Sequence, residues 1–145
     1  MAQTIFTQQE QDTIEEAIRK AELETSGEIR VHIESSCEGN VLDRAAQVFA
    51  KLEMHKTEAR NGVLFYLSHR DHKFAVLGDV GINSRVNGDF WDDIKIKMQI
   101  RFRGGHFVEG LVDGINMAGE QLRHHFPWHE LDNNELSDKI SFGDE

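Results

Sequence analysis

Residues 63–78, VLFYLSHRDHKFAVLG, contain two apolar runs separated by a short polar turn. The first run, residues 63–67, is apolar at every position, as is typical of a central strand that is covered on both faces. The turn at residues 68–72 is short enough for a hairpin, so residues 73–78 are predicted to return antiparallel to the first strand. This hairpin predicts the centre of a sheet that other elements must cover.

A further strand is predicted upstream of the hairpin. Residues 28–34, EIRVHIE, alternate between apolar and polar side chains, which indicates a strand with one exposed face near a sheet edge. Residues 42–52 follow with apolar positions at helical spacing. A strand, a helix and a second strand form a crossover that is right-handed in nearly all proteins, so strands 28–34 and 63–67 should run parallel.

Helices are predicted at both ends of the chain. The first has a capping box at Thr7, an apolar stripe of helical period, and Gly27 at the position of a left-handed C-cap. A third helix is expected to start after Asp89 and to end at residues 104–105, which are both glycine, and a fourth ends near Pro127. Helices packed against a small mixed sheet predict an α/β fold, a three-layer α/β/α sandwich.

Composition limits the function as well as the fold. The chain has 145 residues, 39% of them hydrophobic, which suits one domain with one core. Its net charge of -10 argues against a nucleic-acid partner, because binding to a phosphate backbone requires clustered Lys and Arg. We find no export signal and no apolar segment long enough to span a membrane, so we expect a soluble, cytoplasmic protein without a membrane partner.

The C-terminal residues differ in composition from the rest. They are rich in Asp and Glu, with Lys139 as the single Lys or Arg after position 128. We therefore expect two parts, a folded domain over residues 1–128 and a mobile or loosely docked acidic tail over residues 129–145. The tail suggests one functional hypothesis, that the protein is a non-catalytic module that binds another protein through this segment.

The loop that follows the hairpin has the residue types of an ion site. Residues 78–83, GDVGIN, do not match a dinucleotide-binding fingerprint, because no third glycine stands at the required place and no helix follows directly. Asp79 would also repel an anion. Strand polarity places this loop at the same end of the sheet as residues 55–62, HKTEARNG, so Asp79 and Asn61 are predicted neighbours.

Oxygen donors around this loop predict a divalent cation site. Calcium accepts about six to eight oxygen ligands with loose geometry, and magnesium is the second ion considered. The predicted ligands are Asn61, Asp79, Asp89 and Asp93. In the alternative interpretation these are ordinary turn and cap residues, with Asp89 as the N-cap of a helix that begins at Phe90. A runner-up cation site would combine Glu34, Asp43 and Asp71 at the opposite end of the sheet.

Several segments match one known family in order along the chain: TSGEIRVHIE, RNGVLFYLSHRDHKFAVLGDVGI and FVEGLVDGINMAGEQL. Together they resemble the TPM domain family, which is named for a thylakoid lumen phosphatase, a photosystem II repair protein and a channel modulator. The likeness runs from the first helix to Pro127 and is closest to a short cytoplasmic bacterial branch, in which the terminal ISFG also recurs. It implies an α/β/α sandwich, with acid phosphatase activity in some plant members and calcium binding in others.

The resemblance also implies which residues form the site. The family's asparagine-glycine pair before the central strand falls on residues 61–62, its glycine loop on residues 78–81, and its acidic residue before the next helix on Asp89. We therefore expect a calcium-binding TPM-type domain. The alternative enzyme is a metal-assisted phosphomonoesterase, although the sequence shows no nucleophile with an evident base and no cluster of Arg or Lys to neutralise a phosphoryl group.

Overall fold

The computed structural model describes residues 5–128 and 136–143. Its centre is a four-stranded mixed sheet in the order β3-β2-β1-β4. The strands are β1 (Glu28–Glu34), β2 (Gly62–Ser68), β3 (Lys73–Gly78) and β4 (Ser141–Phe142). Strands β2 and β3 pair antiparallel, with Val63 opposite Gly78, which confirms the predicted hairpin.

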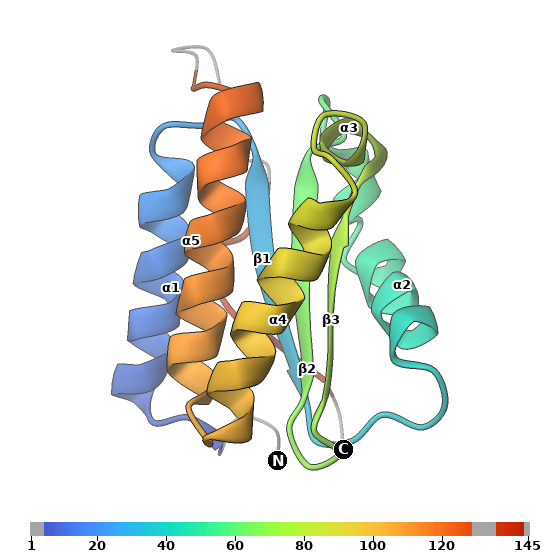
Figure 1. The fold of residues 1–145 in the computed structure, drawn as a ribbon, viewed down its shortest axis with the longest axis vertical. Coiled ribbons are helices and arrows are strands. Elements are labelled where there is room, and N and C mark those ends of the chain that lie inside the picture. Colours follow the sequence, from blue (N-terminus) through green and yellow to red (C-terminus); the bar gives the residue numbers. More distant parts are fainter. Residues whose placement is uncertain (1–4, 129–135, 144–145) are drawn as a thin grey trace.

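Helices cover both faces of the sheet, which confirms the predicted three-layer α/β/α sandwich (Figure 1). Helices α1 (Gln8–Glu22), α4 (Asp89–Arg103) and α5 (Phe107–His125) lie on one face. Helix α2 (Val41–Lys51) and the short 3-10 helix η2 (Met54–Lys56) lie on the other. A four-residue helix, α3 (Val80–Asn83), stands at the end of the sheet. None of the helices in the described ranges is long and apolar enough to cross a bilayer.

Strand β2 joins the two hydrophobic cores. All seven of its residues are buried. Val63 and Phe65 pack into the larger core with α1, α4 and α5, whereas Leu64 and Tyr66 pack into the smaller core beneath α2. Because successive side chains of a strand point to opposite faces, a strand with no polar position in its middle requires a layer of helices on each side.

Strand β1 lies inside the sheet and not at its edge. It pairs in parallel with β2, which confirms the predicted crossover, and also in parallel with β4 on its other side. The expected exposed face is wrong, because His32 and Glu34 are both buried. Arg44 of α2 binds the Glu34 carboxylate, and Ser141 of β4 binds the His32 ring, so the polar face of β1 is covered by α2 and β4.

The start of α1 follows the sequence prediction and its end does not. Thr7 and Glu10 form the expected capping box, in which each side chain accepts a hydrogen bond from the other residue's backbone N–H. The helix ends at Glu22, and Gly27 is not its C-cap. A Cβ atom at Gly27 would lie 2.6 Å from a methyl carbon of Leu122, so this glycine allows α5 to approach the start of β1.

Residues 136–143 of the acidic tail pack against the domain. Ile140 is only 7% exposed, and its backbone N–H donates to the Glu15 carboxylate at 3.1 Å. The backbone N–H of Leu136 donates to the Glu28 carboxylate at 2.7 Å. The expectation of a mobile or loosely docked tail is therefore wrong for residues 136–143, whereas residues 129–135 lie outside the described residues. A protein partner for the tail stays a prediction.

Replacing Ile140 tests this docking. We expect Ile140→Ala to lower the free energy of unfolding by about 2 to 4 kcal/mol, the usual cost of removing a buried aliphatic side chain. Leu23→Ala is the matched control, because Leu23 is 71% exposed and its loss should cost less than about 0.5 kcal/mol. Urea denaturation measures both values. Equal effects of the two substitutions would mean that residues 136–143 do not contribute to the folded core.

Candidate functional site

Asp79 lies directly beside the start of β2. Its backbone N–H donates to the carbonyl oxygen of Gly62 at 2.9 Å, so the prediction that Asp79 and Asn61 lie at the same end of the sheet is confirmed. The Asp79 carboxylate also accepts a hydrogen bond from the backbone N–H of Val80 at 2.7 Å and caps α3. The expectation that no helix follows this loop directly is therefore wrong, because a single helical turn over four residues gives no periodic signal.

The Asp79 carboxylate is buried and paired with Arg60. The guanidinium donates from Nε and Nη2 to the two carboxylate oxygens at 2.7 and 2.8 Å. The Asp79 side chain is 4% exposed, whereas that of Arg60 is 45% exposed. The pairing raises the pKa of Arg60 through the hydrogen bond to Asp79. Sequence reasoning missed this partner, although Arg60 stands next to Asn61 in a loop already assigned to the same end of the sheet.

A close backbone contact holds α3 against the loop that carries Arg60. The backbone N–H of Gly81 donates to the Arg60 carbonyl oxygen at 2.8 Å. A Cβ atom at Gly81 would lie 2.1 Å from the carbonyl oxygen of Ala59, which no side chain could tolerate without movement of the backbone. Gly81 therefore holds the loop and α3 together and keeps Arg60 beside Asp79.

Asn61 is fully buried at the same end of the sheet. Its side-chain amide donates to the Ser26 hydroxyl at 3.4 Å, and its backbone carbonyl oxygen accepts a hydrogen bond from Glu28. The side-chain oxygen Oδ1 has no hydrogen-bond partner among the residues that the structure describes. An unpaired buried acceptor costs about 1 to 3 kcal/mol, so a group that satisfied this oxygen would stabilise the fold.

Asp89 and Asp93 are exposed on the first two turns of α4. The helix begins at Asp89 with Gly88 in the cap position and no side-chain cap, so the alternative prediction of Asp89 as N-cap is wrong. Asn87 instead bonds the backbone N–H of Asp89, which is ordinary turn geometry. Within residues 5–128 and 136–143, no three His, Cys, Asp or Glu side chains are placed to share an ion.

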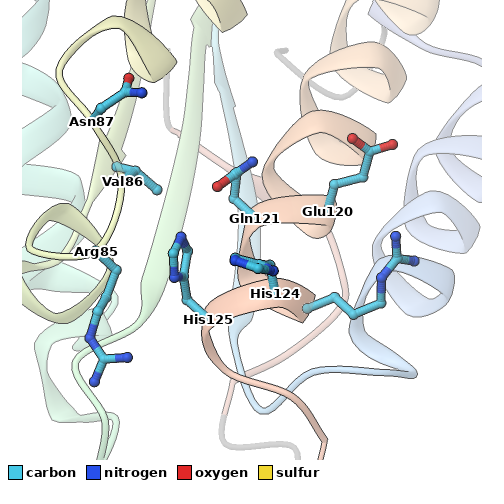
Figure 2. Close-up of a pocket in the computed structure, with 8 residues that line it drawn as sticks. Arg85, Val86, Asn87, Glu120, Gln121, His124 and His125 are labelled. Atoms are coloured by element: carbon cyan, nitrogen blue, oxygen red, sulfur yellow. The ribbon is translucent and has the colours of Figure 1, made fainter.

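An open hollow of about 600 Å³ lies between α5 and the segment that joins α3 to α4 (Figure 2). We call it the α5 hollow. It is lined by Arg85, Val86, Asn87, Glu120, Gln121, Arg123, His124 and His125. Residues 124–125 are polar residues in the last turn of α5. Their place in one hollow with Arg85 has no signal in the local sequence pattern, because it depends on how α5 and segment 85–87 pack.

The opposite end of the sheet holds a second buried carboxylate, Glu34. Arg44 and Tyr66 both donate hydrogen bonds to it, and His32 Nε2 lies 3.2 Å from one of its oxygens. Burial alone would raise the pKa of Glu34, but the hydrogen bonds from Arg44 and Tyr66 and the nearby His32 ring outweigh burial and lower the pKa to about 2. Burial and the bond to Glu34 raise the pKa of Tyr66.

The runner-up cation site at this end does not assemble as predicted. The Glu34 carboxylate is already compensated by Arg44. The Asp71 carboxylate accepts hydrogen bonds from the backbone N–H of Cys37 and from the Ser68 hydroxyl, and Asp43 is exposed on α2. The carboxylates of Glu34 and Asp71 are therefore satisfied by protein donors, which indicates a structural role for both.

The family match agrees with this arrangement of strands and loops. Residues 2–121 match the TPM domain over most of the chain. The chain belongs to the TPM domain family. Among curated proteins, no sequence matches this TPM domain at a significant level.

Solved structures share the TPM fold. The BA42 protein from the psychrophilic bacterium Bizionia argentinensis is 48% identical, with a TM-score of 0.89 over 95% of each chain. The N-terminal domain of the cg2496 protein from Corynebacterium glutamicum is 12% identical, with a TM-score of 0.65 over 81% of this chain and 74% of that one. An N-terminal domain from P. gingivalis is 19% identical, with a TM-score of 0.67 over 86% and 83%. The two similarities below 20% identity show a shared fold and nothing further.

The acid dependence of stability tests the Glu34 cluster. The folded-state pKa of about 2 lies below the unfolded value of about 4.3, so the stabilisation is complete above the unfolded pKa and is lost as the pH falls toward 2. We expect Glu34→Gln to lower the free energy of unfolding by about 3 kcal/mol at neutral pH, because Arg44 loses its buried partner. The variant should also lose less stability than the parent protein between about pH 4.3 and about pH 2.

Urea denaturation at a series of pH values measures both effects. Glu38→Gln is the control, because Glu38 is an exposed glutamate in the loop before α2. If Glu34→Gln and Glu38→Gln changed the acid limb of the stability curve equally, the Glu34 carboxylate would not be the stabilising group.

Proposed function

We propose that this TPM domain binds a calcium ion at the end of the sheet that carries Asp79. The proposed ligands are Asp79, Asn61, Asp89 and Asp93. Asp79 and Asn61 come from adjacent ends of β3 and β2, whereas Asp89 and Asp93 come from the start of α4. Hard oxygen donors of this kind, completed by backbone carbonyl groups and water, suit calcium better than magnesium, which requires near-ideal octahedral geometry.

The observation that carries the proposal is the side chain of Asn61. It is fully buried, and its Oδ1 atom has no partner in the described part of the chain. Asn61 is followed directly by Gly62, whose carbonyl oxygen accepts a hydrogen bond from the backbone N–H of Asp79. No hydrogen bond joins the side chains of Asn61 and Asp79 within the described residues, and a cation is one group that would give both oxygens a common partner.

Arg60 supplies the charge that balances Asp79 when no metal is bound. Its side chain is 45% exposed, so the guanidinium can turn into solvent when another cation takes its place beside the buried Asp79 carboxylate. The Asp79 carboxylate accepts a hydrogen bond from the Val80 backbone N–H, and the Asp79 backbone N–H donates to the Gly62 carbonyl oxygen, so Asp79 keeps its place when Arg60 leaves. A calcium ion would thus replace the guanidinium as the counter-ion. Asp89 and Asp93, which are exposed, would complete the shell by reorientation.

A calcium titration of the metal-stripped protein tests the proposal. We expect saturable amide NMR shifts centred on Asn61, Asp79 and Asp89, and an increase in stability of about 2.7 kcal/mol at calcium concentrations near 100 times Kd. Asp79→Asn should abolish the shifts. Asp43→Asn, at an exposed aspartate of α2, is the control and should leave them unchanged. Arg60→Gln should bind calcium several-fold more tightly, because it removes the competing positive charge.

No saturable shifts at calcium excess in either the parent protein or Arg60→Gln would contradict the proposal. Magnesium in the same titration distinguishes the two ions. Shifts that Asp79→Asn and Asp43→Asn reduce equally would indicate general screening of an acidic protein and not a site.

A metal-assisted phosphomonoesterase is the second candidate function. The observation in its favour is the α5 hollow, where Arg85, Arg123 and two histidines supply the basic side chains that the sequence analysis did not find. Asn87 lines this hollow and bonds Asp89, so the proposed metal site and the basic residues share one segment. A bound cation would polarise a phosphoryl oxygen.

Hydrolysis of a generic aryl phosphate tests this second candidate. We expect repurified protein with added calcium or magnesium to hydrolyse it, Asp79→Asn to lose at least about tenfold in kcat/KM, and Asp43→Asn to retain the activity. Activity that is equal in Asp79→Asn and the parent protein would point to a contaminating enzyme.

A further inference from the structure

The α5 hollow gathers basic side chains on a protein whose net charge is -10. Of the residues that the structure describes, two arginines and two histidines line it, against one carboxylate, that of Glu120. Figure 2 shows Gln121 and His125 projecting from α5 toward the segment 85–87, with the Glu120 carboxylate turned to the other side. The part of the hollow between α5 and segment 85–87 is therefore lined by donors.

Two of the basic groups differ in their partners. Arg123 forms an ion pair with Glu24 at 3.3 Å, so its charge is already partly balanced. Arg85 stacks over the Phe126 ring, with its guanidinium carbon 5.2 Å from the ring centre. No ion pair to Arg85 is found in residues 5–128 and 136–143. Arg85 is exposed and retains a guanidinium that can bind an anion.

The two histidines meet edge to face, with ring centres 4.7 Å apart. Burial, the neighbouring His124 and Arg85 all lower the pKa of His125. Among the described residues, the charged groups that line the hollow with this pair are Arg85 from the segment before α4, and Arg123 and Glu120 from α5 itself. Without a bound anion, a second positive charge beside Arg85 is therefore unfavourable.

We infer that the α5 hollow binds a small divalent oxyanion, the chemistry shared by phosphate, sulfate and phosphate monoesters, through Arg85, His124 and His125, with uptake of protons by the histidines. A planar guanidinium binds two oxygens of such an anion at once, and protonated imidazoles add charge-assisted hydrogen bonds. The side-chain amides of Asn87 and Gln121 supply neutral donors at the rim. Binding by these side chains requires no metal, so the inference is independent of the proposed calcium site.

Proton uptake fixes the direction of the pH dependence. An anion favours the charged form of each histidine, so binding raises the pKa of His125 toward or above its ordinary value. Affinity should therefore increase as the pH falls through the ordinary histidine range. Sulfate is the suitable probe, because it stays divalent throughout this range, and any pH dependence then belongs to the protein.

The experiment is a sulfate titration of the full chain in the presence of a chelator, at about pH 5.5 and about pH 7.5, on either side of the ordinary histidine pKa. Amide NMR shifts should saturate at segment 85–87 and at residues 124–125. We expect binding about tenfold tighter at the lower pH, which corresponds to a tenfold change in the acid dissociation constant of one histidine on binding. A direct titration of the imidazole signals should show a higher His125 pKa when sulfate is present.

Variants separate the roles of the residues. Arg85→Gln should weaken sulfate binding about tenfold at both pH values, because it removes a charge-assisted pair. His124→Gln with His125→Gln should remove the pH dependence and leave binding at the higher pH nearly unchanged. Arg103→Gln is the matched control, since Arg103 is an exposed arginine at the far end of α4. It should leave both affinities unchanged.

Inorganic phosphate and a small aryl phosphate then distinguish the two biological sources of the anion. Tighter binding of the aryl ester, with added shifts at Val86, would identify an ester ligand, and equal binding would identify the free anion. Sulfate shifts that are unsaturable, or equally weakened by Arg85→Gln and Arg103→Gln, would overturn the inference whatever the calcium titration shows. Saturable sulfate binding without calcium binding would support it while the proposed function failed.

Discussion

The burial of β2 on both faces is the constraint on which the rest of the structure depends. A strand without a polar middle position requires one helical layer above it and one below, and a single chain of this length supplies both. The parallel pairing of β1 with β2 places α2 on one face, and the antiparallel return of β3 sends the chain on to α4 and α5 on the other (Figure 1). The loops entering β1 and β2 and leaving β3 therefore meet at one end.

In the part of the chain that the structure describes, each end of the sheet has a buried carboxylate that pairs with an arginine, but the two pairs differ in kind. Glu34 accepts hydrogen bonds from Arg44 and Tyr66 and lies 3.2 Å from His32 Nε2, and this cluster fastens α2 to the sheet. Within the described residues, Asp79 pairs with one charged group, Arg60, whose side chain is 45% exposed. Removing one partner of Glu34 leaves several buried groups unpaired, whereas another cation can replace Arg60 beside Asp79. This contrast is why the proposed ion site lies at the Asp79 end.

Local sequence patterns predicted the helices and strands well, but they predicted less well which faces of the sheet are buried by other elements. The hairpin and the capping box at Thr7 depend on residues close in sequence, and both were predicted correctly. The alternation in residues 28–34 predicted an exposed face that does not exist, because Arg44 and Ser141 supply hydrogen bonds to the polar side chains there. Strand β4 has only two residues and no periodicity, so nothing in the sequence pattern distinguished it from a tail.

The sequence by itself determined the strand directions, and hence that Asn61 and Asp79 lie at the same end of the sheet, because hydrophobic periodicity and turn length are local properties. Only the tertiary structure decided which charges face one another. Arg60 lies against Asp79, and Arg85 shares a hollow with residues 124–125 at the end of α5. The physical reason is that electrostatic interaction depends on distance in space, and folding brings together charges from segments that are far apart along the chain.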